Sequence, residues 1–407
     1  MTSNLLREYA KLIVKKGVNV QKGQIVAIKG PVEVYDFIRL VVDEAYKAGA
    51  GKVVVMYDDV YNTRANYIYQ GLDFLKEVPD YVVSQMHYLV DNKYCAISLV
   101  SPNVDALNGL DPAKMMASNL VSREKLKFSS EYTMNNDGQW VVAGVSSKAW
   151  ANKVFPNDEN AVDKLWEAIF KACHVSDFDT VENWTKHSEA ISEHAKLLND
   201  LDLEKLHFKN SLGTDLEVYL ATNNLFSGGD EYSNSGIRFS PNIPTEEVFG
   251  MPYKTKVNGK VVATKPLNYQ GSLIEDFYLE FKDGKVINYD ARVGLDNLKT
   301  LINFDEGSSY LGEVALISYD SPISNMNILF YNTLFDENAS CHLALGASYP
   351  SNIKGGTSMT RSELAKLGSN YSNTHVDFMF GSKDMEVKGT TKDGKEVLIF
   401  KDGNFVI

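Results

Sequence analysis

The N-terminal part of the chain alternates short β-branched runs with longer stretches of helical spacing. The clearest short runs cover residues 24–29, 52–58, 95–100 and 139–145. Residues 31–51 between the first two have helical spacing, with Pro31 suited to a first turn and Gly49 to a C-terminal cap. Strands that alternate with helices are typical of a parallel sheet, so we predict a Rossmann-like α/β domain. The first strand is not followed by a G-x-G-x-x-G turn, and no nucleotide site is inferred.

Helical spacing returns at about residues 158–201. The apolar positions that fit it are Leu165, Ile169, Trp184, Ile191 and Leu197. We expect this stretch to link two domains, because a single core rarely grows beyond about 250 to 300 residues.

From residue 205 onward, the sequence pattern predicts strands joined by tight turns. Asn258-Gly259 and the Asp-Gly steps at Asp283, Asp393 and Asp402 each lie between alternating apolar residues, a pattern typical of β-hairpins. We therefore predict an N-terminal α/β domain with its helical linker over 1–200, and a β-rich α+β domain over 201–407.

Composition narrows the class of protein. The 407 residues are 44% hydrophobic and 23% charged, as in an ordinary globular enzyme. The first residues read as an amphipathic helix and not as a signal peptide, and no apolar run reaches the roughly 20 residues that span a bilayer. We expect a soluble protein that binds no membrane. A net charge of -12 disfavours nucleic acid as a partner.

The three cysteines are too few and too scattered for a disulfide framework or a thiolate zinc site. A reducing, cytoplasmic location fits them best. Cys341 lies beside a histidine, but a small buried apolar role suits it better than metal binding.

Candidate chemistry is concentrated in four segments. The first, SPNIPTEEVFGMP at residues 240–252, restricts the backbone around Glu246 and Glu247 with prolines, although adjacent acids in a loop are usually solvated. In the second, Glu313 interrupts a strand-like apolar run over 312–316. A buried carboxylate needs a cation or strong donors, which favours a functional role.

The third and fourth segments add imidazoles. NTLFDENASCHLALG carries Glu337 and His342 next to a helix expected from about residue 339 to residue 346. THVDFMFG carries His375 and Asp377, which point to the same face if the segment is a strand. Each segment also has a simpler interpretation. His342 considered alone fits a buried core histidine, and His375 with Asp377 fits a surface ion pair.

Together these residues make a consistent binuclear metal site. Three glutamates and one aspartate would neutralise two divalent cations, and two neutral imidazoles would complete the shells. Oxygen and nitrogen ligands without thiolate suit zinc, cobalt, manganese or magnesium, and do not distinguish among them.

The four segments resemble the aminopeptidase T family, peptidase family M29, which includes the staphylococcal and streptococcal aminopeptidases S. The resemblance rests on SPNIPTEEVFGMP, YLGEVALIS, FYNTLFDENASCHLALGASYP and THVDFMFG, in that order. It implies a metallo-aminopeptidase that acts on peptides, with a catalytic Tyr349, a bridging Glu313 and a homodimer with a large internal cavity. The implied ligands are Glu247, Glu313, Glu337, His342, His375 and Asp377.

A bridging water between two ions would then attack the first peptide bond, with the metal and Tyr349 stabilising the oxyanion. Glu246 is one candidate for the general base, and Glu337 is another if it lies partly outside the first shell. A binuclear phosphoesterase and a non-catalytic, metal-stabilised peptide-binding dimer are the alternatives.

Overall fold

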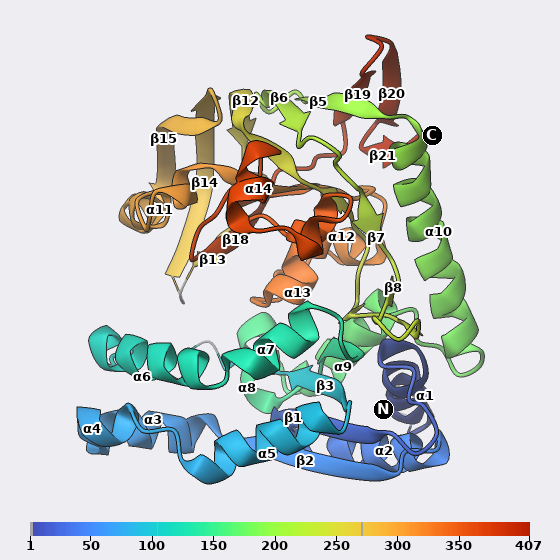
Figure 1. Ribbon diagram of the computed structural model, residues 1–407, viewed down its shortest axis with the longest axis vertical. Coiled ribbons are helices and arrows are strands. Elements are labelled where there is room, and N and C mark those ends of the chain that lie inside the picture. The colour runs from blue at the N-terminus through green and yellow to red at the C-terminus, as the bar shows by residue number, and fades with distance from the viewer. Residues whose placement is uncertain (1–2, 104, 270–271) are drawn as a thin grey trace. The chain divides into compact units, whose positions relative to one another are not determined.

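The four short apolar runs of the N-terminal part form a parallel sheet. They become β1 (Ile25–Pro31), β2 (Lys52–Asp58), β3 (Cys95–Val100) and β4 (Trp140–Gly144). A short fifth strand, β10 (Asn242–Ile243), joins them in the order β10-β4-β3-β1-β2, and each neighbouring pair is parallel. The predicted α/β architecture is therefore confirmed (Figure 1).

Helices connect and cover these strands. They are α1 (Ser3–Leu12), α2 (Tyr35–Lys47), α3 (Val60–Tyr69), α4 (Leu72–Leu75), α5 (Asp80–Asp91), α6 (Pro112–Lys125), α7 (Lys127–Met134), α8 (Lys148–Val154), α9 (Ala161–Ala172) and α10 (Thr180–Asp200). The stretch expected at 158–201 thus forms two helices. Most of its expected apolar positions are buried, but Leu197 is exposed and Leu198 takes the buried position.

The computed structural model describes residues 3–103, 105–269 and 272–407, and it divides into two units. The N-terminal unit comprises Met1–Lys186 and Asp230–Pro244, and the C-terminal unit comprises His187–Gly229 and Thr245–Ile407. The first boundary between the units falls within α10. The later segment Asp230–Pro244 belongs again to the N-terminal unit. The two units are defined by which residues pack together and not by which segments fold independently. The predicted domain boundary at residue 200 therefore stays a prediction.

The C-terminal unit is built from two antiparallel sheets, as expected for a β-rich domain. The larger has the order β13-β14-β12-β6-β5-β19-β20-β21, with β15 also paired to β14. Its strands are β5 (Leu203–Lys209), β6 (Asp215–Leu220), β12 (Pro252–Val262), β13 (Leu267–Tyr269), β14 (Ser272–Lys282), β15 (Lys285–Val293), β19 (Glu386–Thr391), β20 (Glu396–Lys401) and β21 (Asn404–Phe405).

The smaller sheet has five strands in the order β18-β17-β16-β11-β7. They are β7 (Ser227–Gly228), β11 (Val248–Gly250), β16 (Leu311–Leu316), β17 (His342–Gly346) and β18 (His375–Met379). The helices of this unit are short, namely α11 (Leu295–Ile302), α12 (Pro322–Met326), α13 (Thr333–Asp336) and α14 (Arg361–Lys366). A separate two-stranded ribbon in the other unit pairs β8 (Glu231–Tyr232) with β9 (Arg238–Phe239).

Three of the four expected hairpin turns are correct. The steps at Asp283, Asp393 and Asp402 join β14 to β15, β19 to β20 and β20 to β21. The expectation at Asn258-Gly259 is wrong, because both residues lie inside β12. A side chain at Gly259 would meet the carbonyl oxygen of Asp215 at 2.2 Å, so this glycine serves a close approach between strands.

The helix expected at residues 339–346 is also wrong. Residues 342–346 form β17, which lies between β16 and β18 and is buried along its whole length. A strand covered on both faces shows no alternation of polar and apolar residues, so its pattern resembles a short buried helix.

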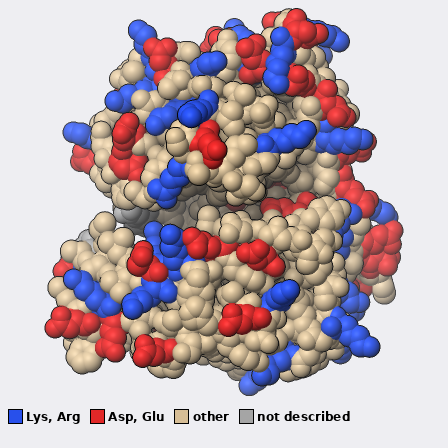
Figure 2. All heavy atoms as spheres, viewed as in Figure 1, with Lys and Arg blue, Asp and Glu red and all other residues tan. Residues whose placement is uncertain are grey.

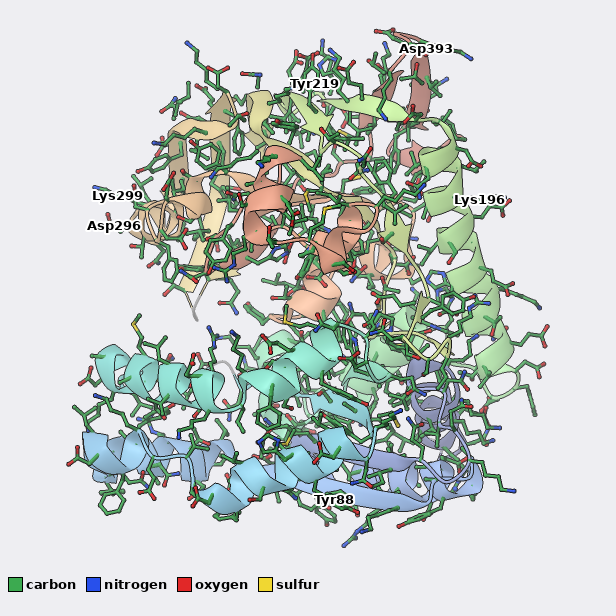
Figure 3. All side chains as sticks on the ribbon, in the orientation of Figure 1. Tyr88, Lys196, Tyr219, Asp296, Lys299 and Asp393 are labelled. Atoms are coloured by element: carbon green, nitrogen blue, oxygen red, sulfur yellow. The ribbon has the colours of Figure 1, made fainter. Side chains whose placement is uncertain are left out.

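The core of the C-terminal unit lies between its two sheets. Val314, Leu343 and Phe378 occupy one cross-strand row of the smaller sheet and belong to the same buried cluster as Leu206 and Phe208 of β5. Helix α11 buries Leu298, Leu301 and Ile302, while its Asp296 and Lys299 lie on the outer side (Figure 3).

The surface carries charges of both signs. Lys and Arg are interspersed with Asp and Glu on the face in Figure 2. Within the described ranges, no helix is both long enough and apolar enough to cross a bilayer.

Candidate metal centre

Cross-strand register gathers the candidate ligands on one face of the smaller sheet. Glu313 lies opposite Ala344, which lies opposite Asp377, and residues directly opposite each other point to the same face. His342 and His375 share that face, because each is two residues from a member of this row. The residue between Glu313 and Asp377 is the small Ala344, while the neighbouring row of Val314, Leu343 and Phe378 points into the core.

Five of the predicted site residues meet at this face in two groups that share Glu313. Nε2 of His342 lies 3.2 Å from Oε2 of Glu247 and 3.3 Å from Oε1 of Glu313. Nε2 of His375 lies 3.6 Å from Oε2 of Glu313 and 3.3 Å from Oδ1 of Asp377. Each group brings three possible ligand atoms within 4.8 Å of one another, and the two oxygens of Glu313 face different groups.

Backbone carbonyls fix both imidazole rings. Nδ1 of His342 donates to the carbonyl oxygen of Glu337 at 2.9 Å, and Nδ1 of His375 donates to that of Ala347 at 2.7 Å. A carbonyl only accepts, so each Nδ1 carries a proton and each Nε2 faces the carboxylates. This arrangement is typical of metal-binding histidines, whose second nitrogen is held by an outer partner.

Glu337 enters the cluster from a 3₁₀ turn, Glu337–Ala339, just before β17. Asp377 and Glu247 are the nearby carboxylates that act most strongly on it. The next residue, Asn338, is fully buried and ties two ligand-bearing segments together. Its Oδ1 accepts a hydrogen bond from the backbone N–H of Glu246 at 2.7 Å, and its Nδ2 donates to the carbonyl oxygen of Leu334 at 3.0 Å.

The electrostatics indicate that the cluster requires positive charge. Burial raises the pKa of Glu313 and of Glu337, and neighbouring carboxylates raise both further. Burial opposes charge on the histidines, yet the hydrogen bonds of His342 with Glu247 and Glu313 hold its pKa well above the usual value. For His375, the charge of Asp377 outweighs burial and raises the pKa to about 9. Protons therefore supply the balancing charge that a divalent cation would otherwise provide.

The donor set fits a divalent metal. Oδ1 of Asp377 is buried and, among the described residues, receives no hydrogen bond, although Nε2 of His375 lies 3.3 Å away. A buried carboxylate oxygen without a donor is unfavourable unless a cation neutralises it. Its position in one of the two groups makes Asp377 a suitable ligand.

Tyr349 lies at the edge of the cluster, just after β17. Its ring centroid is 4.8 Å from that of His375 and 6.3 Å from that of Phe249. Burial, and then the charges of nearby carboxylates beginning with Glu313, raise the pKa of Tyr349. The residue as a whole is 41% exposed. Its hydroxyl group remains a proton donor at neutral pH.

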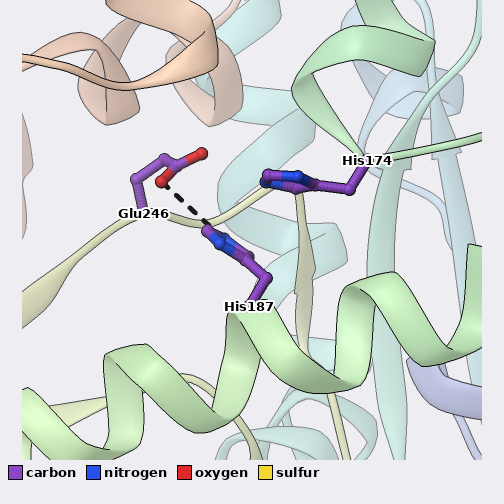
Figure 4. A group of neighbouring side chains, drawn as sticks. All are labelled: His174, His187 and Glu246. Carbon is purple, nitrogen blue, oxygen red and sulfur yellow. Dashed lines mark ion pairs between the residues drawn. The ribbon is translucent and has the colours of Figure 1, made fainter.

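Glu246 points toward a different partner from its neighbour Glu247. Its Oε2 forms an ion pair with Nε2 of His187 at 3.7 Å (Figure 4). The same nitrogen lies 2.8 Å from the carbonyl oxygen of Thr245. Glu246 thus stands beside the cluster without belonging to either three-residue group, and its role as a base stays a prediction.

Cys341 packs into the structure as expected. Its Sγ lies 3.4 Å from both the backbone nitrogen and the carbonyl oxygen of Ile317, on the core side of the sheet. Burial raises the pKa of its thiol to about 11, so the thiolate that a metal would require is disfavoured.

Sequence reasoning missed the residues that hold the ligands in place. Asn338 acts through its side-chain amide, and Glu337 and Ala347 act through their backbone carbonyl groups. These residue types carry no signal of such a role in a sequence. Asn338 adjoins a candidate ligand, which was the only clue available in the sequence.

Comparison with known proteins agrees with this geometry. Residues 2–405 match the model of the family described as thermophilic metalloprotease (M29). Aminopeptidase AmpS of Bacillus subtilis (strain 168) is 44% identical over 99% of this chain and 98% of its own length. Aminopeptidase PepS of Streptococcus thermophilus is 40% identical over 99% of this chain and 98% of its own length.

A solved structure has the same fold over its whole length. Wild-type AmpT from Thermus thermophilus matches with a TM-score of 0.92 and 34% identity, and the match covers 99% of each chain. The fold class predicted from the sequence is thereby confirmed, as is the resemblance on which the metallopeptidase expectation rested. With a family match over nearly every residue and relatives this similar over their full lengths, the chain belongs to the M29 family of thermophilic metalloproteases.

Proposed function

We propose that this metal-dependent aminopeptidase binds two divalent ions, one in each of the three-residue groups, with Glu313 as the shared ligand. The observation that carries the proposal is the position of Glu313, whose two carboxylate oxygens lie within 3.6 Å of two different imidazoles. Glu337 would complete the set from the turn before β17. Four carboxylates and two neutral imidazoles would balance two divalent charges, and zinc, cobalt, manganese and magnesium all suit such ligands.

When bound, such ions lower the pKa of a water molecule and polarise the scissile carbonyl group. The residues of the chain would supply the remaining functions. The protonated hydroxyl of Tyr349 would donate a hydrogen bond to the oxyanion that forms on the substrate. Glu246, one residue from Glu247 and paired with His187, would accept a proton as the general base.

The substrates would be peptides with a free amino terminus, shortened one residue at a time. The alternative of a phosphoesterase would need basic side chains to hold phosphate. Nε of Arg238 is paired with Asp230 at 2.6 Å, and Nζ of Lys254 lies over the ring of Tyr310 at 4.7 Å. Both cations therefore have other partners, and no observation favours phosphate binding.

A chelator experiment tests the metal requirement. Chelation should abolish cleavage of aminoacyl anilides while leaving the protein folded, because the two sheets of the C-terminal unit share a large apolar core away from the cluster. Adding back zinc, cobalt, manganese or magnesium should restore activity and identify the preferred ion. Full activity in protein shown by elemental analysis to be metal-free would contradict the proposal.

A peptide experiment tests where the cut falls. A free tetrapeptide should lose residues in order from its amino end, while its N-acetylated twin stays intact, because acetylation removes a charged contact and adds bulk. Mass spectrometry over time would follow both peptides. Internal cleavage of the acetylated peptide at a comparable rate would leave the metal site standing and overturn the exopeptidase assignment. Binding of metal without turnover of any peptide would instead favour a non-catalytic role.

We also propose a homodimer in the cytoplasm. Large side chains on helices α3 to α5 are exposed, including Tyr69, Phe74 and Tyr81, and such surfaces often mark contacts between proteins. All three cysteines are buried thiols, which suits a reducing compartment. Light scattering coupled to size exclusion should give twice the mass of the chain, and cell fractionation tests the location.

A further inference from the structure

A small cavity of about 30 Å³ lies next to the candidate ligands Glu337 and Asp377. Leu267 and Asn268 of β13 and Met379 of β18 contribute other parts of its wall. A single water needs roughly 10–15 Å³ on this scale, so the cavity admits a group of the size of one or two waters.

The position of Asn268 is fixed by the strand that carries it. In β13, Asn268 pairs with Leu273 of β14. The backbone N–H of Thr264, just before this strand, donates to the carbonyl oxygen of Met379 at 2.9 Å and ties the segment to β18. Leu267 and Met379 are 7% and 3% exposed, and they limit the access of water to the cavity.

The carboxamide of Asn268 has an unused acceptor. Its Oδ1 is buried, and no donor for it exists within residues 3–103, 105–269 and 272–407. Buried polar atoms are nearly always hydrogen-bonded, so an acceptor of this kind indicates a bound group that carries a donor. Another polar residue of the wall, Asp336, is already engaged. Its carboxylate accepts backbone N–H groups of Phe330 at 2.7 Å and of Asn332 at 3.0 Å.

The chemistry of the wall fits an ammonium group. An ammonium has three donors and no acceptor, and it is close to water in size. Here it would find one carboxamide oxygen together with the carboxylates of Glu337 and Asp377. We propose that Asn268 accepts a hydrogen bond from the free α-amino group of the peptide substrate in this cavity. This inference rests on the proposed aminopeptidase function, because it requires the first peptide bond to lie at the Glu313 cluster.

Such a subsite would help to make the enzyme an exopeptidase. An acetylated amino terminus has no positive charge, keeps a single N–H donor and carries extra heavy atoms that the cavity cannot hold. A residue inside a peptide is excluded for the same reasons. Recognition would therefore depend on the amino group and not on the side chain of the first residue.

Binding of a non-hydrolysable probe tests the proposal without relying on turnover. The probe is leucinol, an amino alcohol, and its partner is the same alcohol without the amino group. Isothermal titration calorimetry would be run on the metal-loaded protein, on Asn268→Leu and on Asn268→Asp, which keeps an oxygen in place. Asn288→Leu on β15, where the asparagine is exposed, serves as the matched control. Thermal unfolding and elemental analysis would accompany each variant, and Asn268→Ala would replace any leucine variant that fails to fold.

The wild-type protein should bind leucinol more tightly than the plain alcohol. Asn268→Leu should weaken leucinol binding by roughly 10- to 100-fold, the range for one hydrogen bond to a charged group, with binding of the plain alcohol and the metal content unchanged. Asn268→Asp and Asn288→Leu should retain the preference. An unchanged preference in both Asn268→Leu and Asn268→Ala would overturn the inference. A wild-type protein that does not distinguish the two probes would instead contradict the proposed recognition of amino termini.

Discussion

Glu313 on β16 and Asp377 on β18 lie in one cross-strand row, separated only by the residue of β17 that pairs with both. Because that residue is Ala344, the two carboxylates project past a methyl group and converge on the same face of the sheet. Glu313 also contacts His342 on its other side, whereas Asp377 contacts His375 alone among the ion pairs of the described residues. The two acids therefore differ in their expected importance for metal binding.

We expect Glu313→Gln to lose both ions, and Asp377→Asn to lose mainly the ion next to His375. A neutral amide at the shared position removes the single negative charge that both groups use and replaces one of the two carboxylate oxygens with an NH2 group, which is a poor metal ligand. Turnover should fall by several orders of magnitude in both variants. Elemental analysis after dialysis would give the number of ions that each variant retains.

The matched control is Glu280→Gln on β14, where the acid is partly exposed and lies 4.0 Å from Lys260. It should bind metal and turn over substrate as the unmodified protein does. If Glu313→Gln kept one full equivalent of metal while Asp377→Asn lost both, the shared ligand would have been assigned to the wrong residue.

Much of this arrangement was predictable from the sequence. Glu313 is recognisable as a candidate site residue because a single acid interrupts an apolar run. That run forms the buried strand β16. His375 and Asp377 were recognisable as a same-face pair because they are two residues apart, and β18 is indeed a strand. In both cases the signal is local and depends only on the geometry of one strand.

What the sequence could not provide is the pairing between distant segments. The run that contains His342 has the sequence pattern of a short helix, because β17 is covered on both faces and has no alternation. Asn258-Gly259 has the composition of a turn, yet the glycine serves a close contact with β6. The register that aligns Glu313 with Asp377 depends on contacts across the sheet, and no short pattern encodes those.

We expect Asn338→Ala to weaken metal binding although Asn338 touches no proposed ion. Its amide joins the Glu246 backbone to the turn that carries Glu337, so its loss frees both ligand-bearing segments. Outer partners of this kind typically contribute about 10- to 100-fold in metal affinity. Competition with a chelating dye would measure the change.

Asn199→Ala provides the control for the loss of stability alone. Asn199 also makes two hydrogen bonds to backbone, with the N–H and the carbonyl oxygen of Phe226, but it holds no proposed ligand. Both variants should lower the free energy of unfolding by about 1–3 kcal/mol. Only the Asn338 variant should lose metal affinity, and an equal loss in both would reduce Asn338 to a structural role.

We expect Cys341→Ser to keep both metal content and turnover. The thiol lies against the backbone of Ile317 and its pKa of about 11 keeps it protonated, so it is a poor ligand. A serine hydroxyl can form the same two hydrogen bonds at some cost in apolar packing, and a modest loss of thermal stability should follow. Loss of metal as complete as in His342→Ala would show that the thiol belongs to the site.

We expect Tyr349→Phe to lower turnover by roughly 100-fold or more, the usual effect of losing one oxyanion donor. The ring contacts with His375 and Phe249 remain, because only the hydroxyl group is removed. Metal content and the Michaelis constant should change little, since the lost hydrogen bond forms only as charge develops on the substrate oxygen. Steady-state kinetics with an aminoacyl anilide, together with elemental analysis, would measure all three quantities.

Tyr371→Phe is the matched control for this hydroxyl, because Tyr371 is half exposed and its hydroxyl donates to Asn373 at 3.1 Å. Its removal should leave turnover unchanged. A fall in metal content in Tyr349→Phe would mean that the hydroxyl supports the ions and not the reaction, since an oxyanion donor has no role before substrate binds. Turnover equal to that of the unmodified enzyme would mean that Tyr349 contributes only its ring, which packs beside His375 and orients that imidazole.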